Sequence, residues 1–326
     1  MSGTRSFKAA LAAVLAALSV GAAAQADYPS KPVRFIFPST AGGSGVGLMH
    51  VLAEKLSAKW KQPVIVEPRP GANSAIGTDL VAKSAPDGYT ILMASSQHVI
   101  LHHTMRNLPY DAIRDFTPIT GVARMQYIMA ANPALPANNL QEFIALLKAK
   151  PEGYTFGSGG AGGPGHLAME QFMKMSGTRL RYIPYNNKGM AAVLAELMGG
   201  QIDIYVTPPG IGSYVSSGKL KALAVSGDAR ARALPNVQTF KEAGLPQLDA
   251  SAWYAVLGPA NLPRPIVDKL AADFAEVLAM PDVREKIANL EMEPLVMGPA
   301  QFGALMRADK DRYTKIIQDA GLVLGN

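Results

Sequence analysis

The chain has 326 residues, of which 48% are hydrophobic and 17% are charged, and its formal net charge is +6. The chain has no cysteine and therefore no disulfides. A chain of this length can bury a large core, so it does not need them for stability. Its basic residues are spread along the chain and form no stripe interleaved with aromatic residues, which argues against nucleic-acid binding. The charge implies only a weak general attraction for anions.

The first 26 residues have the pattern of a secretory signal peptide. Arg5 and Lys8 give a positive start, an alanine-rich apolar run follows at 9–20, and Ala24-Gln25-Ala26 matches an A-x-A cleavage site. The apolar run is too short for a membrane-spanning helix. We therefore expect a protein that is cleaved after Ala26 and released into a bacterial periplasm.

Strand-like and helix-like segments alternate along the rest of the chain. Runs rich in β-branched and aromatic residues predict strands at 33–37, 64–67, 90–95, 127–131, 154–156, 181–185, 202–206, 223–226 and 253–259. Apolar residues at helical spacing predict helices at 48–60, 75–84, 140–150, 166–175, 189–198, 211–217, 265–280, 281–290 and 299–320. Pro265, Pro281 and Pro299 stand near predicted helix starts, and Asn138-Asn139 are candidate caps. The alternation predicts an α/β protein with two parallel-rich sheets flanked by helices.

The order of these segments predicts two lobes, of which the first is interrupted. The strands between about 127 and 250 form a self-contained series, whereas the helices after Trp253 have no sheet of their own and must return to the first. We therefore expect one lobe from 27–126 and 252–326, and a second from 127–251. A central cleft between such lobes, at the carboxyl ends of strands, is where α/β sheets bind ligands.

Two glycine-rich turns each connect a predicted strand to a predicted helix. The first is Thr40-Ala41-Gly42-Gly43-Ser44-Gly45, and the second is Gly157-Ser158-Gly159-Gly160-Ala161-Gly162-Gly163-Pro164-Gly165-His166. Such a turn presents bare backbone N–H groups at the positive end of a helix, which favours an anion. The sequence therefore predicts a protein that holds a negatively charged molecule.

A nucleotide cofactor is not expected, although Gly157, Gly159 and Gly162 fit the G-x-G-x-x-G pattern. That pattern also requires an acidic residue about 20 positions further on, at the end of the next strand. The next predicted strand is followed by Asn186-Asn187-Lys188 instead. We predict no cofactor.

The sequence contains no clear catalytic or metal-binding group. His102-His103 are adjacent, so on a helix they cannot act as paired metal ligands four residues apart. His166 falls in an early helix turn, where a structural role is expected, whereas His98 follows a strand and could reach the cleft. Ser158 could be a nucleophile, but spacing identifies no acid–base partner for it. A hydrolase or transferase is therefore the alternative, and no catalytic residue or metal site is predicted.

Many ordered blocks of the sequence resemble one protein family. They are Tyr28-Pro29-Ser30-Lys31-Pro32-Val33-Arg34, Glu67-Pro68-Arg69-Pro70-Gly71-Ala72, Ala85-Pro86-Asp87-Gly88-Tyr89-Thr90, Leu108-Pro109-Tyr110-Asp111 with Asp115-Phe116, Gly199-Gly200-Gln201-Ile202-Asp203, Gly218-Lys219-Leu220-Lys221-Ala222-Leu223-Ala224-Val225, Leu234-Pro235-Asn236-Val237 and Glu242-Ala243-Gly244-Leu245-Pro246. These blocks resemble the Bug family, the TctC-type periplasmic substrate-binding proteins of tripartite tricarboxylate transport systems. The match runs from Tyr28 almost to the C-terminus.

The resemblance implies a two-lobed periplasmic binding-protein fold of type II, whose lobes close on a small organic carboxylate. It implies that the carboxylate is clamped by the two glycine loops, at Thr40, Ala41, Gly42, Gly43 and Ser44 and at Ser158, Gly159, Gly160, Ala161 and Gly162. It implies further that Ser95, Ser96, Gln97 and His98, with Thr207 and Pro208, line the wall that reads the rest of the ligand. We expect a monomer. Its implied partner is a membrane transporter, and the alternative is a sensor that feeds a signalling system.

Two departures from the family pattern bear on the ligand. Relatives often place Asp where this chain has Val46 and Thr207, and the assigned cleft loops carry neither Asp nor Glu. Because a desolvated ammonium group needs a fixed acid nearby, we expect a non-amino mono- or dicarboxylic acid. The alternative is that an acid from elsewhere, such as Asp249, folds into the cleft.

Overall fold

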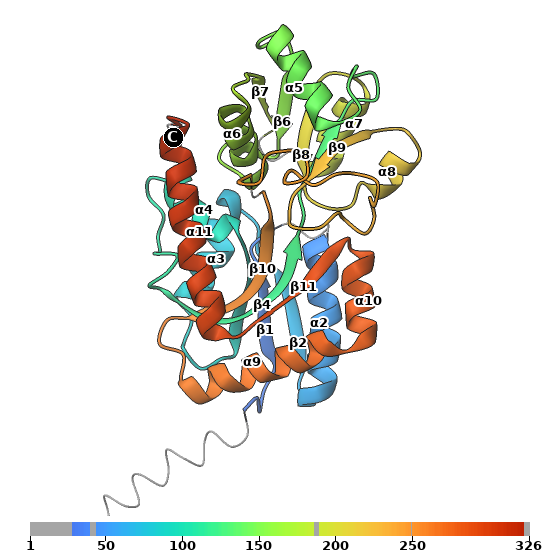
Figure 1. Ribbon diagram of the computed structural model, residues 1–326. Coiled ribbons are helices and arrows are strands. Elements are labelled where there is room, and N and C mark those ends of the chain that lie inside the picture. The colour runs from blue at the N-terminus through green and yellow to red at the C-terminus, as the bar shows by residue number, and fades with distance from the viewer. Residues whose placement is uncertain (1–27, 40–43, 186–188, 249, 323–326) are drawn as a thin grey trace, which may run out of the picture.

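The computed structural model describes residues 28–39, 44–185, 189–248 and 250–322. The predicted signal peptide, the first four residues of the first glycine loop and Asp249 lie outside these residues. The described chain forms two α/β lobes, one above the other in Figure 1.

Lobe 1 is built on a sheet of six strands. In spatial order these are β11 (Met292–Met297), β4 (Phe116–Met125), β10 (Ala252–Pro259), β3 (Thr90–Ser95), β1 (Val33–Phe37) and β2 (Val64–Pro68). Two strands of this sheet, β10 and β11, come from the C-terminal part of the chain. The sequence predicted that the helices of this part return to the first sheet. Lobe 2 holds β7 (Arg181–Pro184), β6 (Thr155–Ser158), β8 (Ile204–Thr207), β5 (Ile128–Ala131) and β9 (Lys221–Val225). The lobe boundaries near residues 126 and 252 stay a prediction.

Both sheets are mixed rather than parallel-rich. In lobe 1, β1 pairs in parallel with β2 and β3, whereas β10 is antiparallel to both β3 and β4. In lobe 2, β6 is parallel to β7 and β8, but β5 is antiparallel to β8 and β9. The antiparallel pairs arise where the chain crosses between lobes, because β4, β5 and β10 adjoin the crossings. Hydrophobic patterning does not encode strand direction.

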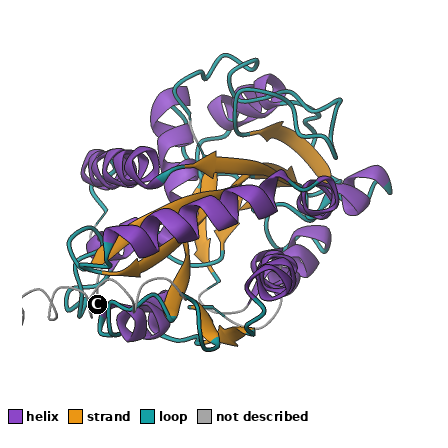
Figure 2. Ribbon diagram, turned by 90° about the horizontal axis from the view of Figure 1, so that it is seen from below, coloured by secondary structure: helices purple, strands orange, loops and turns teal. Residues whose placement is uncertain are grey.

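Helices cover both faces of each sheet (Figures 1 and 2). In lobe 1, α2 (Ser44–Trp60), α9 (Arg264–Ala279) and α10 (Pro281–Asn289) pack on one face, and α3 (Ala75–Ala82), α4 (Gln97–Thr104) and α11 (Pro299–Asp319) pack on the other. In lobe 2, α5 (Leu140–Ala149) and α6 (Pro164–Ser176) lie opposite α7 (Gly189–Met198) and α8 (Gly212–Ser216). None of the helices in the described part of the chain combines the length and apolarity needed to cross a membrane.

The strand pattern explains how one sheet buries two faces. Phe35 and Phe37 of β1 join the core under α2 and α9, whereas Ile36 between them joins the core under α11. The C-terminal helices are also held by buried hydrogen bonds, since Trp60 Nε1 donates to Asp273 at 2.7 Å and Trp253 Nε1 donates to Asp309 at 2.7 Å. These contacts fix α9 and α11 on lobe 1.

Local signals at helix starts agree with the structure. Asn139 caps α5, because its Oδ1 accepts the backbone N–H of Glu142 at 2.9 Å, and the Glu142 carboxylate accepts the N–H of Asn138 at 2.8 Å. Pro265, Pro281 and Pro299 each occupy the first turn of their helix, where a missing N–H costs nothing.

Candidate functional site

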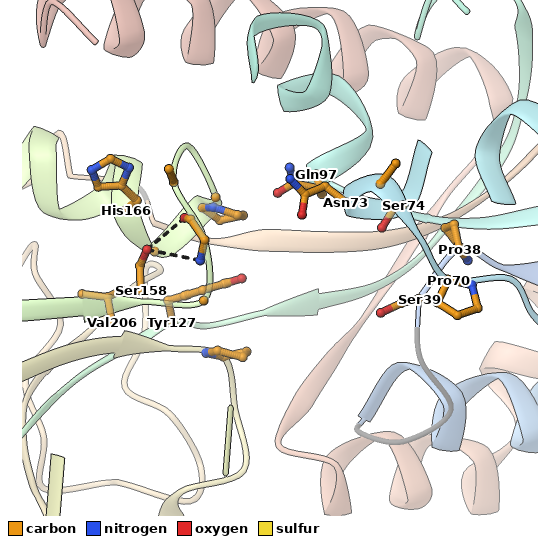
Figure 3. A pocket seen from close by; sticks show the side chains of 18 of the residues that line it. Pro38, Ser39, Pro70, Asn73, Ser74, Gln97, Tyr127, Ser158, His166 and Val206 are labelled. Carbon is orange, nitrogen blue, oxygen red and sulfur yellow. Dashed lines mark hydrogen bonds between the residues drawn. The ribbon is translucent and has the colours of Figure 1, made fainter. Parts of the chain in front are cut away.

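A cavity of about 530 Å³ lies between the two lobes. Lobe 1 lines it with the segments that follow β1, β2 and β3, and lobe 2 lines it with the ends of β6 and β8 and the segments that follow them (Figure 3). Tyr127, between β4 and β5, also lies on the wall. The lining residues are Pro38, Ser39, Pro70, Gly71, Ala72, Asn73, Ser74, Gln97, Tyr127, Ser158, Gly159, Gly160, Ala161, Gly163, Pro164, Gly165, His166, Tyr205, Val206 and Pro208. Its size is that of a small-molecule site.

Helix starts converge on this cavity from both lobes. Gln97 opens α4, Pro164 opens α6, and the Ala72–Ser74 turn immediately precedes α3. The N-terminal end of a helix carries partial positive charge and unpaired backbone N–H groups, so it attracts anions. The cavity therefore presents positive backbone potential from opposite walls.

Most polar groups of the described cavity wall are amides, hydroxyls and backbone groups. Among the described residues, no Asp, Glu, Lys or Arg lines the cavity, and no group of three metal-ligating side chains is found. Burial raises the pKa of Tyr127 well above its ordinary value and that of Tyr205 to about 12, so both phenols stay protonated and can donate hydrogen bonds. Such a wall can offer an anion hydrogen bonds and dipoles rather than a counter-charge.

The second glycine loop, residues 158–163, is held by its own hydrogen bonds. Ser158 Oγ lies 2.9 Å from the carbonyl oxygen of Gly160 and 2.9 Å from the hydroxyl of Tyr182. Gly162 takes a left-handed φ of 72°, which glycine adopts without strain, and its N–H donates to His166 Nδ1 at 2.8 Å. We call residues 158–163 the glycine cradle, and all of them except Gly162 lie on the cavity wall.

A second loop on the opposite wall has an unusual backbone. Gly71, Ala72, Asn73 and Ser74 all have positive φ, at 130°, 45°, 52° and 84°. Side chains other than glycine adopt this region at a cost of about 1–2 kcal/mol each. Strained backbone of this kind concentrates at functional sites. We call these four residues the left-handed turn.

The structure divides the residues assigned to the site by sequence. Gln97, Ser158, Gly159, Gly160, Ala161 and Pro208 lie on the cavity wall, and their contact with a ligand stays a prediction. Ser95, Ser96, His98, Gly162 and Thr207 are not on the wall. Thr40, Ala41, Gly42 and Gly43 lie outside the described residues, and Ser44 begins α2.

The residues that are off the wall have structural surroundings. His98 is buried in lobe 1, where Nε2 contacts the carbonyl oxygen of Ala112 at 2.8 Å and the ring stacks on Tyr110. Burial lowers the pKa of His98 to about 4. His98 is the second residue of α4, so its side chain turns into the core while Gln97 faces the cavity. Thr207 is fully buried, and Val46 packs against the core of lobe 1.

The geometry does not support a nucleophilic role for Ser158. Its hydroxyl is fully buried and contacts Gly160 and Tyr182, neither of which is a general base. His166 is the one histidine on the cavity wall, but its Nδ1 accepts the N–H of Gly162. The acid–base partner that the enzyme hypothesis needs is therefore not formed by these residues.

Several wall residues were not expected from the sequence. The left-handed turn falls in a segment that carried only the family resemblance, and Tyr127 lies where the chain crosses from β4 to β5. Only the first of the four residues of the left-handed turn is a glycine, so the sequence does not indicate that all four have positive φ. Tyr205 lies inside β8, so its place on the cavity wall could have been predicted only by knowing which face of that strand points to the cavity.

Comparison with known proteins places this architecture in a family. Residues 48–322 match the model described as the tripartite tricarboxylate transporter family receptor, TctC. The chain is 32% identical over 314 residues to Protein BugT of Bordetella pertussis, covering 95% of this chain and 96% of that protein. It is 33% identical over 319 residues to a UPF0065 protein from the gbd 5' region of Cupriavidus necator, covering 97% and 96%.

Solved structures share the fold. The periplasmic binding protein BugD superimposes with a TM-score of 0.79 at 29% identity, covering 92% of this chain and 100% of that one. The R. palustris protein Rpa4515, solved with adipate, superimposes with a TM-score of 0.81 at 28% identity, covering 90% and 98%. The predicted two-lobed fold is thereby confirmed.

Proposed function

Because the chain belongs to the TctC family of solute-binding receptors, we propose that it captures a small non-amino organic carboxylate in the periplasm and delivers it to a tripartite tricarboxylate-type membrane transporter. The observation that carries the proposal is the interlobe cavity. Helix starts reach it from both lobes, and its described wall has no charged side chain.

The neutral wall supports a carboxylate rather than an amino acid. A desolvated ammonium group needs a carboxylate beside it, and none lies on the described wall. A carboxylate, by contrast, is satisfied by backbone N–H groups and neutral donors at helix starts. The similar R. palustris receptor was solved with adipate, a dicarboxylic acid without an amino group.

Two polar walls also suit a ligand with two acidic ends. One carboxylate would lie on the glycine cradle of lobe 2, and a second polar end would face Asn73, Ser74 and Gln97 of lobe 1 (Figure 3). The apolar parts of Tyr127, Val206 and Pro208 would then contact the carbon chain. We propose that the protein binds without converting its ligand, since the groups that contact the Ser158 hydroxyl among the described residues are the Gly160 carbonyl and the Tyr182 hydroxyl.

Calorimetry on the mature protein tests this function with paired ligands: succinate against aspartate, and glutarate against glutamate, with adipate added. We expect the non-amino acid to bind more tightly in each pair. At a hundredfold excess over Kd, the bound acid should raise stability by about 2.7 kcal/mol. Tighter binding of both amino acids, or chemical conversion of the recovered ligand, would refute the proposal.

A further inference from the structure

His166 is a buried side chain on the described cavity wall. It is 3% exposed, and both of its ring nitrogens have partners. Nδ1 accepts the N–H of Gly162 at 2.8 Å, and Nε2 lies 3.3 Å from the Glu170 carboxylate, one helical turn along α6. His166 therefore links the glycine cradle to α6.

The partners fix where the ring proton lies. A backbone N–H can only donate, so Nδ1 must present its lone pair to Gly162. A neutral ring with its lone pair on Nδ1 carries its hydrogen on Nε2, and the Glu170 carboxylate 3.3 Å from Nε2 favours a hydrogen at that position electrostatically. The Glu170 carboxylate thus favours the tautomer in which His166 can hold Gly162.

Ring stacking extends this link to the other end of the cradle. The rings of His166 and Tyr182 stack with centroids 4.1 Å apart and planes 13° apart. The Tyr182 hydroxyl lies 2.9 Å from Ser158 Oγ, which in turn contacts Gly160. One stack of two rings therefore holds both Ser158 and Gly162, the residues that flank the cavity-lining positions 159–161.

From this arrangement we propose that His166 and Glu170 are positioning residues, which hold the glycine cradle in its anion-binding shape by fixing the tautomer that accepts the Gly162 N–H. The proposal rests on the proposed function, since it concerns the same site. Neither residue needs to contact the ligand. A cradle already in its binding shape loses less conformational freedom when the ligand binds, which raises affinity.

The test compares His166→Phe with wild type by calorimetry, using adipate as the probe. Phe keeps an aromatic ring for stacking on Tyr182 but cannot accept the Gly162 N–H. We expect adipate affinity to fall at least tenfold. Glu170→Leu removes the negative oxygen near Nε2 and should weaken binding several-fold, whereas Glu170→Gln keeps a partly negative amide oxygen there and should bind within about twofold of wild type.

The matched control is His98→Phe, because His98 is also 3% exposed but lies in the core of lobe 1. It should lower stability to a similar extent and leave affinity unchanged. Affinity of His166→Phe within twofold of wild type, or an equal loss in His98→Phe, would overturn the positioning role.

Measurements on the ligand-free protein separate this proposal from the proposed function. Nitrogen-15 NMR should report His166 with its hydrogen on Nε2, and exchange of the Gly162 amide should accelerate in His166→Phe and Glu170→Leu but not in His98→Phe. Hydrogen on Nδ1, or unchanged Gly162 exchange, refutes the positioning role even if adipate binds. If no carboxylate binds while these signals appear as expected, the proposed function fails and the cradle geometry stands.

Discussion

Two glycines near the cradle are constrained in opposite ways. A Cβ added at Gly165 would lie 2.5 Å from the carbonyl oxygen of Val206, closer than real side chains approach, so α6 could not pack on β8. A Cβ added at Gly159 would meet no heavy atom within 4 Å, and Gly159 lies on the cavity wall. The first glycine serves packing, and the second keeps the cavity open.

Gly159 should therefore affect binding rather than stability, whereas Gly165, which also lines the cavity, should affect stability first. Gly165→Ala should lower the free energy of unfolding by about 1–3 kcal/mol through overpacking. Gly159→Val should leave that free energy within about 0.5 kcal/mol of wild type, as for a surface substitution, but weaken carboxylate binding at least tenfold by filling the wall. Urea unfolding and calorimetry on both variants measure the two effects. Unchanged affinity in Gly159→Val would remove this position from the site.

His98 should make stability depend on pH. Burial lowers its pKa in the folded protein to about 4, against about 6.5 in the unfolded chain. Between these values the unfolded chain binds a proton that the folded protein does not, so stability is full above pH 6.5 and falls as the pH decreases. The slope is at most about 1.4 kcal/mol per pH unit.

Urea unfolding at pH 7 and pH 4.5 checks this expectation. His98→Phe, which has no titrating ring, should lose less stability over that interval than wild type. The nearby Asp111 carboxylate and the Ala112 carbonyl oppose the shift, and both are unchanged in the variant. Parallel pH profiles for the two proteins would show that the folded protein protonates His98 as readily as the unfolded chain does.

At the scale of elements, the left-handed turn before α3 carries strain that its sequence does not relieve. Ala72 has a φ of 45° and is exposed, so its strain is not offset by burial of its side chain. Ala72→Gly should raise the free energy of unfolding by about 0.5–1 kcal/mol. This is the cost of the left-handed conformation for Ala, reduced by the greater conformational freedom that Gly gives the unfolded chain. Ala72→Val should lower it by about 1 kcal/mol or more, because β-branched residues fit this region worst. Thermal melts of both variants decide, and destabilisation by Gly would contradict the strain argument.

The elements that the sequence predicted well are those with uninterrupted patterns. The strand at 90–95 and the helix at 189–198 have the predicted bounds. The strands β4 and β11 were missed because Pro118 and Gly121 interrupt the first and Pro294 the second. Both pairings of β4 contain register shifts, and β11 is an edge strand, where proline is tolerated. Pattern alone could not distinguish these strands from loops.

At the scale of the whole molecule, the sequence predicted one wall of the site better than the other. The glycine cradle was found because glycines between a strand and a helix have a local signature. The left-handed turn and Tyr127 were not predicted, because they come to the cavity only when β5 and β10 bring the two lobes together. Strand direction, lobe approach and the inward turn of His98 depend on packing between distant segments, which no local window contains.

The lobes also touch outside the cavity, through Glu291 in the turn between α10 and β11. Its carboxylate accepts the N–H of Gly210 at 2.7 Å and that of Gly212 at 3.3 Å, at the start of α8 in lobe 2. Glu291 has a left-handed φ of 57°, so the turn holds the side chain toward the other lobe. This contact stabilises the arrangement in which both lobes line the cavity.

Removing that contact should shift the molecule toward open forms and weaken binding without touching the ligand. Hydrogen bonds to a charged group contribute about 1.5–3 kcal/mol, and the partial exposure of this contact favours the lower end, so Glu291→Ala should weaken carboxylate binding about tenfold. Glu291→Gln keeps one acceptor oxygen and should lose less, and Glu285→Ala, an exposed acid on α10, should bind as wild type. X-ray scattering should show ligand-free Glu291→Ala with a larger radius of gyration than wild type, and a saturating ligand should restore the wild-type value. Equal affinity and equal radius in the Ala variant would show that the Glu291 contact is the same in the open and closed forms, and that closure is governed by the ligand alone.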